Sequence, residues 1–350
     1  MATEMHGEPM PPTSRGPSRR QVLRLTAVAV VGLALSGGVA ADLVRRGRLH
    51  RVSVTRTKLG TAVNVTVVHP DADDAHRMVE AAFAEFERLE NVFSRYRSGT
   101  AVSRLNREGV VADAPGELVE VMTHALEYSK LSGGAFDVTV APVLNLYVSR
   151  FAQTDVPPPD DEVEAALSLV GWQGVRIDGS TIALERPGMA VTMDAIAKGF
   201  VVDHAVAVLT REGAEKVMVE AGGDMSTTGG EDEPWQIGIQ DPHDLQGTLG
   251  VLQLRGEALG SSGDYMQYFT PDKRYNHIID PRTGRSPEHS SGTTIRAPRA
   301  IDADAMSTSV FVLGPVEGIA LLDRLDGVEG MLVTKTGEQV MSKGFRGSIV

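Results

Sequence analysis

The first structural signal in this chain is the spacing of its apolar residues. In Ala62–Val68 apolar and polar residues alternate, which puts Val63, Val65 and Val67 on one face and predicts a strand. In Asp73–Phe93 apolar residues recur every three or four positions, which predicts an amphipathic helix. The folded part of the chain therefore begins with a strand and a long helix.

Proline and glycine mark the ends of three further predicted helices. One covers Pro115–Ser132, with proline in its first turn and Gly133–Gly134 after its last. Pro157–Pro159 is a rigid loop that leads into a helix with an acidic first turn, which stops at Gly171. The last of the three covers Ala195–Glu212.

Short β-rich runs lie between and after these helices. No repeat or linker interrupts the chain from about residue 50 to its C-terminus. Because strands and helices mix without a regular βαβ alternation, we predict an α+β fold, a single-domain sandwich of mixed sheets and helices. The later predicted strands are Lys216–Val219, Trp235–Ile239, Thr248–Leu254, Thr293–Ala297 and Met331–Thr334.

Composition excludes several classes of function. The chain has 350 residues, of which 42% are hydrophobic and 23% charged, which is typical of a globular protein. Its formal net charge of -12 argues against a general nucleic-acid binder, because phosphate contacts need clustered Lys and Arg. It has no cysteine, which excludes disulfides, thiolate zinc sites, a cysteine nucleophile and a lipid-bearing cysteine.

The N-terminal 41 residues have the layout of an export signal. Residues 1–17 are rich in Pro, Gly, Ser and Thr and are predicted to be disordered. In residues 18–41 the pair Arg19–Arg20 precedes an apolar run that ends in small residues, as in a twin-arginine signal. The alternative is a membrane anchor, although the run is short for a stable span. We expect an exported protein, on the outer face of the membrane or in a periplasm-like space.

Three glycine-containing clusters could bind a ligand, and each also has a purely structural explanation. Gly133–Thr139 follows a helix and could be a C-cap leading into a strand. Thr192–Phe200 opens a helix, where free N–H groups could hold a phosphate beside Lys198 or could simply be capped. In Glu220–Asp224 two glycines would let the backbone approach a ligand or form an ordinary turn.

The last third of the chain holds a denser set of polar residues. Ser261–Tyr265 and Tyr275–Gly284 are separated by about ten residues. His277 lies in the second stretch, where it is either a base or a satisfied polar group. Asp304 and Thr308 are four apart and would share one face of a helix. Their oxygens are of the type that magnesium prefers, although a carboxylate at a helix start with a back-bonded threonine is the structural alternative.

The order of these clusters resembles the FAD:protein FMN transferase family (ApbE-like, older name thiamine-biosynthesis lipoproteins). The resemblance covers about residues 52–345, where we place the transferase domain. It implies that FAD binds in a cleft between two halves of the domain, with magnesium at the pyrophosphate. The motifs that carry it are, in order, FSRY with SRLN, GGAFDVTVAPVLNLY, MDAIAKGFVVDHA, VEAGGDM, SSGDYMQYF, YNHIIDPRTG and ADAMSTSVFVLG.

The resemblance also implies roles for individual residues. Asp304 and Thr308 match the side-chain metal ligands, and the backbone carbonyl of Ala195 matches a third ligand. Leu59 replaces a methionine that commonly contacts the flavin, a nearly volume-conserving exchange. Thr192 stands where many relatives carry an aspartate. The positions at which family members touch FAD correspond to Leu59, Tyr96, Ala135, Phe136, Asp137, Thr192, Lys198 and His277.

The implied reaction attaches the FMN half of FAD to a Thr or Ser hydroxyl of an exported target protein and releases AMP. The target would carry a short Asp-x-Ser/Thr-Gly-Ala-Ser/Thr-like sequence. Magnesium would neutralise charge on the pyrophosphate. His277 is the expected general base, because an imidazole titrates near neutral pH, and Asp302 is the second candidate. Many relatives are anchored by a lipidated cysteine, so any anchoring of this chain must come from residues 18–41.

Two other functions would use the same residues. In the first, water replaces the protein hydroxyl and the chain is a magnesium-dependent FAD pyrophosphatase. In the second, it is a non-catalytic exported flavin-binding protein. The pair Asp304 and Thr308 argues against the second, since flavin storage needs no metal. The pyrophosphatase requires the same metal and base as the transferase, so sequence does not separate these two.

Overall fold

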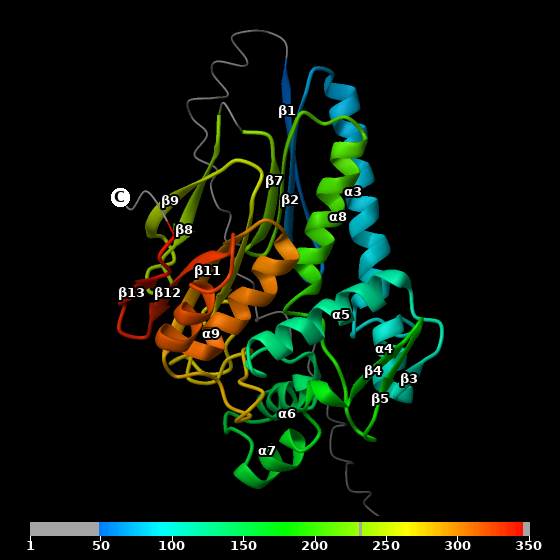
Figure 1. Ribbon diagram of the computed structural model, residues 1–350, viewed down its shortest axis with the longest axis vertical. Helices are drawn as coiled ribbons and strands as arrows, with labels where there is room; N and C mark the ends of the chain where they lie inside the picture. The colour runs from blue at the N-terminus through cyan, green and yellow to red at the C-terminus, as the bar shows by residue number, and fades with distance from the viewer. Residues whose placement is uncertain (1–48, 231–232, 346–350) are drawn as a thin grey trace, which may run out of the picture.

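The computed structural model describes residues 49–230 and 233–345 (Figure 1). At its centre is a sheet of eight strands in the order β1-β2-β6-β7-β10-β11-β12-β13, in which neighbouring strands run antiparallel. Mixed helices and sheets confirm the predicted α+β class. The strands of this sheet are β1 (His50–Lys58), β2 (Thr61–His69), β6 (Lys216–Ala221), β7 (Asp224–Thr228), β10 (Ala258–Gly263), β11 (Ser290–Ala297), β12 (Glu329–Thr334) and β13 (Gln339–Met341).

Three helices cover one face of the central sheet (Figure 1). α3 (Ala72–Phe93) lies on β1 and β2, α8 (Ala197–Arg211) on β6 and β7, and α9 (Ala300–Leu322) on β10 to β12. Asp71 caps the start of α3, and its carboxylate accepts hydrogen bonds from two N–H groups of the first turn. α9 is long and apolar enough to cross a membrane, but it is mostly buried between the sheet and the other helices, as expected of a core helix.

A two-stranded hairpin covers part of the opposite face. It consists of β8 (Trp235–Gln240) and β9 (Thr248–Leu254), which pair antiparallel. Alternate residues of β8 are apolar and buried, and they pack against Met225 on β7 and Leu259 on β10. The middle of the central sheet is therefore buried on both faces, by helices on one side and by the hairpin on the other.

The remaining elements form a mostly helical part below the sheet in the view of Figure 1. A small sheet in the order β3-β5-β4 packs beside four helices and two short 3₁₀ turns. These elements are α4 (Ala101–Glu108), β3 (Val110–Val111), α5 (Gly116–Leu131), α6 (Ala141–Phe151), α7 (Asp160–Leu167), β4 (Val175–Asp178) and β5 (Thr181–Leu184), with 3₁₀ turns at Val138–Val140 and Trp172–Gly174.

The predicted helices and strands are present with shifted bounds. The stretch after Gly134, for which a strand was one structural alternative, forms a 3₁₀ turn that Asp137 caps and that runs directly into α6. α7 ends at Leu167 and not at Gly171, because the chain tightens there into i→i+3 hydrogen bonds. The predictions for residues 1–17 and 18–41 lie outside the described residues.

Candidate active site

Several candidate residues gather at one end of the central sheet. The two-residue turn Leu59–Gly60 joins β1 to β2, and the turn Gly222–Gly223 joins β6 to β7. A Cβ atom on Gly222 would lie 2.7 Å from Oγ1 of Thr61, so glycine lets the two turns touch. The starts of α8 and α9 reach the same end of the sheet.

A lysine and two aspartates form a buried cluster where these elements meet. Nζ of Lys198, in the first turn of α8, lies 2.5 Å from Oδ2 of Asp224 at the start of β7. The same Nζ lies 3.3 Å from Oδ1 of Asp304 on α9. The backbone N–H of Gly199 donates to Oδ2 of Asp304 over 3.0 Å. The structure thus brings together the predicted phosphate contact and the predicted metal ligand.

This cluster carries one more acidic group than it has basic groups. Asp224 and Asp304 are 0% and 2% exposed, so both carboxyls are removed from water. Burial raises the pKa of each, and their mutual repulsion adds to the rise at Asp224. Although burial opposes its charge, Lys198 has its pKa raised by the two carboxylates. Two buried carboxyls face one ammonium, so both are ionised together only when a further cation joins the cluster.

Glycine allows α9 to approach its neighbours closely. A Cβ atom on Gly199 would lie 2.2 Å from the carbonyl oxygen of Ala300, and one on Gly260 would lie 2.4 Å from that of Ala303. Both distances are far below a van der Waals contact, so α8 and β10 could not touch α9 with any larger residue. This packing carries Asp304 into the cluster.

The predicted metal ligands include oxygens of three chemical kinds. Thr308 lies one turn after Asp304, and its hydroxyl is 3.2 Å from that of Ser262 on β10. Ala195, whose carbonyl is the third predicted ligand, lies in the turn directly before α8. Carboxylate, hydroxyl and carbonyl oxygens suit magnesium. Among the described residues, no group of three or more His, Cys, Asp or Glu side chains is placed to hold a metal.

His277 is oriented by a single carbonyl group. Its Nδ1 lies 2.9 Å from the carbonyl oxygen of Gln267, which can only accept, so Nδ1 carries the proton and Nε2 keeps its lone pair. Burial lowers the pKa of the imidazole below its ordinary value, and the nearby charge of Lys198 lowers it further. The ring is therefore neutral at pH 7 and has a free acceptor nitrogen, as a general base requires.

Asp302, the second candidate base, is engaged elsewhere. Its carboxylate accepts a hydrogen bond from the Tyr128 hydroxyl and two more from Arg299, at 2.9 and 2.6 Å. These bonds hold the start of α9 against α5. Asp302 therefore serves the packing of two helices, and its prediction as a base has no structural support.

The motif around Asp137 is buried, and the Asp137 carboxylate already has hydrogen-bond donors within the protein. Ala135 and Phe136 are 1% and 2% exposed, so neither presents surface to a ligand, and their contact with FAD stays a prediction. The Asp137 carboxylate accepts from the N–H and hydroxyl of Thr139, at 2.8 and 2.6 Å, and from the N–H of Trp172 at 2.8 Å. Direct contact of the Asp137 side chain with FAD remains a prediction.

Two other predicted FAD contacts occupy constrained positions. Thr192 is buried, and its N–H donates to the carbonyl of Val138 over 2.8 Å, which joins two of the sequence motifs. Leu59 has φ 51°, a left-handed conformation that usually requires glycine. Such a conformation costs about 1–2 kcal/mol and is often retained at functional sites.

Tyr96 differs from its neighbours in being 77% exposed. The preceding residue, Arg95, lies with its guanidinium carbon 4.5 Å from the centre of the Tyr96 ring. Nε of Arg95 donates to Asp194 over 3.0 Å, and another of its nitrogens donates to Asn145 over 2.6 Å. The structure thus presents an aromatic face to solvent beside the turn that precedes Lys198.

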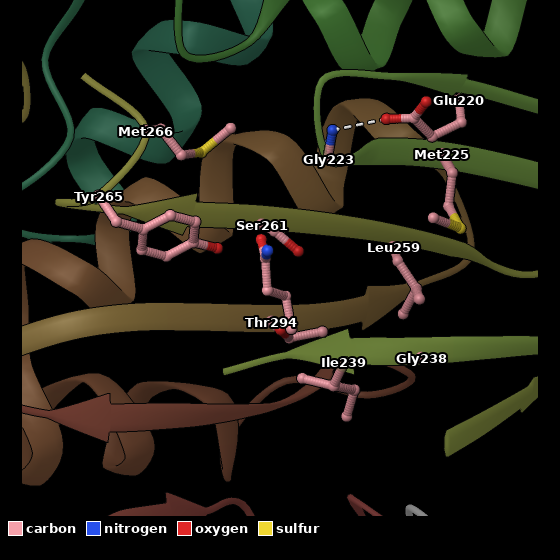
Figure 2. A pocket seen from close by; sticks show the side chains of 11 residues that line it. Glu220, Gly223, Met225, Gly238, Ile239, Leu259, Ser261, Tyr265, Met266 and Thr294 are labelled. Atoms are coloured by element: carbon pink, nitrogen blue, oxygen red, sulfur yellow. Dashed lines mark hydrogen bonds between the residues drawn. The ribbon is translucent and has the colours of Figure 1, made fainter. Parts of the chain in front are cut away.

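A cavity lies behind the cluster, between the central sheet and β8 (Figure 2). Glu220 on β6 and Ser261 on β10 supply polar groups, and Met225 and Met266 supply apolar ones. Oε1 of Glu220 accepts from the N–H of Gly223 over 2.9 Å. Burial nevertheless raises the pKa of the Glu220 carboxyl to about 7.

Sequence reasoning missed three of these residues as parts of a site. Asp224 and Glu220 were noted only as the ends of a glycine turn, and Arg95 only as a letter in a motif. A sequence signal existed for Glu220, since it is an acidic residue within an apolar run that reads as a buried strand. For Asp224 and Arg95 no local pattern points to their charged partners, Lys198 and Asp194, which lie 26 and 99 positions away.

Sequence comparison finds close agreement with one family over most of the chain. Residues 59–332 match the family model described as the ApbE family. The FAD:protein FMN transferase of Treponema pallidum (strain Nichols) is 32% identical over 314 residues, which cover 82% of this chain and 86% of the relative. The FAD:protein FMN transferase of Escherichia coli (strain K12) is 27% identical over 346 residues, covering 94% and 98%.

Solved structures agree with the sequence comparison. The flavin transferase ApbE from Vibrio cholerae has a TM-score of 0.76 and 28% identity, covering 85% of this chain and 98% of that one. The ApbE protein from Thermotoga maritima has a TM-score of 0.77 at the same identity, covering 84% and 97%. The matching family model, the shared fold and the coverage of most of the chain lead to one conclusion: this protein is a member of the ApbE family.

Proposed function

We propose that this protein transfers the FMN half of FAD to a Thr or Ser hydroxyl of a target protein, with magnesium, and releases AMP. The observation that carries the proposal is the buried cluster of Lys198, Asp224 and Asp304 at the start of α8. It has an ammonium for a phosphate and a second carboxyl that a bound cation would hold in its ionised form. Membership of a family whose relatives are named FAD:protein FMN transferases supports the same reaction.

The residues of this chain can perform the proton transfer that the reaction needs. The hydroxyl oxygen of the target forms a bond to the phosphorus on the FMN side, and the bond from that phosphorus to the oxygen of AMP breaks. Nε2 of His277 accepts the hydroxyl proton, since Nδ1 is held by the Gln267 carbonyl. The AMP phosphate leaves with the extra negative charge, which Lys198 is placed to stabilise.

The magnesium ion would be held by the carboxylate of Asp304, the hydroxyl of Thr308 and the carbonyl of Ala195. When bound, it neutralises charge on the pyrophosphate oxygens and lowers the barrier to phosphoryl transfer. Lys198 must then exchange part of its contact with Asp304 for the substrate phosphate. Asp224, 2.5 Å from Nζ, keeps the ammonium at the site during that exchange.

The cavity of Figure 2 is not part of the proposed FAD site. Its volume of about 40 Å³ has room for a few water molecules but not for an adenine ring. Gly223 lines this cavity, whereas the next residue, Asp224, points to Lys198 on the other face of β7. We therefore place the phosphates of FAD at Lys198, on the helix-covered face of the sheet.

Export and the nature of the target belong to the same proposal. Residues 18–41 would direct the folded protein out of the cytoplasm by the twin-arginine route, or anchor it to the membrane. Covalent attachment of a flavin is useful there, because free flavin would diffuse away. Replacing Arg19 and Arg20 by Lys should leave the protein in the cytoplasm, and unchanged export of that variant would point to the general secretory route.

The transfer reaction is tested by mixing the mature protein with FAD, Mg²⁺ and an acceptor domain that carries an Asp-x-Ser/Thr-Gly-Ala-Ser/Thr-like sequence. We expect a flavin-fluorescent acceptor band after denaturing electrophoresis, which disappears with a chelator and when the acceptor hydroxyl is replaced by alanine. A band of equal intensity in chelator would contradict the metal assignment. Absence of any labelled acceptor, with FMN and AMP formed, would identify a pyrophosphatase.

A further inference from the structure

The guanidinium of Arg95 donates hydrogen bonds to three side chains from different elements of the fold. Nε donates to Oδ2 of Asp194 over 3.0 Å, Nη1 to Oδ1 of Asn145 over 2.6 Å, and Nη2 to the Tyr96 hydroxyl over 2.6 Å. These partners lie in three different places: the turn before α8, helix α6, and the loop after α3. We refer to Arg95, Tyr96, Asn145 and Asp194 as the Arg95 bracket.

The side chain of Arg95 is unusually buried for an arginine near the molecular surface. The side chain of Arg95 is 9% exposed, whereas that of its ion-pair partner Asp194 is 51% exposed. Tyr96, stacked on the guanidinium, is 77% exposed. The arginine therefore supports the inner side of a ring whose outer side is open to a ligand. A planar guanidinium with fixed donors holds such a ring far better than a lysine would.

The bracket also reaches the phosphate end of the proposed site. Asp194 immediately precedes Ala195, and its backbone carbonyl lies 3.4 Å from Nζ of Lys198. The turn that carries Asp194 is thus connected to Lys198 on one side and to Tyr96 on the other, through Arg95. Arg95 therefore links the aromatic ring of Tyr96 to the turn that Lys198 contacts.

We propose that Arg95 is a positioning residue, which holds Tyr96 as a platform for the flavin ring at a fixed distance from the phosphate site. The proposal rests on the proposed function, since it assumes that the ligand is FAD. Arg95 itself touches no part of the substrate. It acts through Tyr96 and through the turn at Asp194, and therefore affects the flavin half of the ligand more than the adenosine half.

The test compares ligands that contain or lack the flavin ring. For Arg95→Ala we expect FAD and FMN to bind at least tenfold more weakly, measured by flavin fluorescence, while ADP binds less than threefold more weakly. In the transfer assay KM for FAD should rise with kcat changed less than threefold, the signature of lost binding that is common to ground and transition states. Arg95→Lys keeps the charge but loses the planar, fixed donors of the guanidinium, so its affinity for FAD should fall between those of the wild type and Arg95→Ala.

A double-mutant cycle separates positioning from general stability. If Arg95 acts through Tyr96, the double variant Arg95→Ala/Tyr96→Ala should bind FAD no more weakly than Tyr96→Ala alone. The matched control is Arg88→Ala, because Arg88 also joins helices, through Glu85 and Glu117, at 2.8 and 2.6 Å. That control should bind FAD and ADP like the wild type.

Three results would overturn the positioning role: equal losses for FAD and ADP, additive losses in the cycle, or unchanged FAD binding by Arg95→Ala. If Arg95→Ala does not fold, Arg95→Lys gives the same comparison of FAD with ADP. A wild-type protein that binds no FAD would instead contradict the proposed function. A wild type that binds FAD, with an Arg95→Ala variant that binds it equally well, would contradict the bracket alone.

Discussion

At the scale of single residues, the site depends on side chains whose partners are distant in the sequence. The common face of Asp304 and Thr308 follows from their spacing of four, and could be predicted. The contact of Asp304 with Lys198 joins residues 106 positions apart, and no local pattern reveals it. The same holds for Asp224. Sequence therefore predicts that Asp304 and Thr308 share a helix face, but not the charges that surround them.

His277 is expected to give the reaction a characteristic pH dependence. The pKa of His277 lies below the ordinary 6.5. The transfer rate should therefore rise with pH only below pH 6.5, where the imidazole loses its proton, and should be constant at higher pH. His277→Ala should lose this rise and lower the rate by roughly 10²–10⁴-fold, with little change in FAD affinity. Initial rates between pH 5 and 8 provide the measurement.

A different result for His277→Ala would change its role. If FAD affinity falls in proportion to the rate, His277 is a flavin contact and not the base. Glu220, which titrates near pH 7, serves as a control because its own ionisation could shape the profile. The rise attributed to His277 should persist in Glu220→Gln.

Asp304→Asn should abolish transfer while the fold is retained. Asparagine keeps the volume of the buried side chain but removes the negative charge that a divalent cation needs. We expect Mg²⁺ binding, measured by calorimetry in the presence of ADP, to be lost together with activity. The control is Asp302→Asn on the same helix, which loosens the contact with Arg299 and should leave Mg²⁺ binding unchanged. Retained Mg²⁺ affinity in Asp304→Asn would refute the ligand assignment.

Glu220 should make the stability of the protein depend on pH. Its pKa is about 7 in the folded state against an ordinary 4.5, so between these values the folded state binds more protons than the unfolded state. The free energy of unfolding must then fall as pH rises from 4.5 to 7, by up to about 3 kcal/mol from this group. Urea denaturation at pH 5 and pH 8 should show a smaller decrease for Glu220→Gln than for the wild type. Equal decreases would show that Glu220 is ionised at pH 5.

At the scale of elements, predictions from sequence succeeded where apolar residues have a regular period. α3 and β8 show their period over their whole lengths, and both were predicted within one residue of their bounds. β10 (Ala258–Gly263) was missed because it contains few large apolar residues. The reason is physical: α9 approaches so closely that Gly260 has no room for a side chain. Close packing removed the hydrophobic signal that would have identified the strand.

The packing of α8 on α9 is tested by Gly199→Ala. The added methyl group would lie 2.2 Å from the Ala300 carbonyl oxygen, so the two helices must move apart. We expect a loss of about 1–3 kcal/mol in the free energy of unfolding, as for other overpacked sites, and weaker Mg²⁺ binding because Asp304 moves with α9. Gly116→Ala in α5 is the control, since nothing lies within 4 Å of the added atom there. An unaffected Gly199→Ala variant would contradict the close contact.

At the scale of the whole molecule, the central sheet separates the proposed site from the cavity. The helix-covered face presents Lys198, Asp224 and Asp304, and the face covered by the β8–β9 hairpin contains the cavity near Glu220. The turn Gly222–Gly223 lies between them, and Gly223 lines the cavity. The α+β class was predictable from element types, whereas this division needs the strand order.

The central claim, transfer of FMN to a protein hydroxyl, is tested most directly by following both products of FAD cleavage at once. The mature protein is incubated with FAD, Mg²⁺ and an excess of acceptor domain, and released AMP, free FMN and acceptor-bound FMN are quantified by chromatography and mass spectrometry. The account predicts one acceptor-bound FMN for each AMP, attached at the Thr or Ser of the acceptor sequence, with little free FMN. AMP accompanied by an equal amount of free FMN, with the acceptor unmodified, would contradict it.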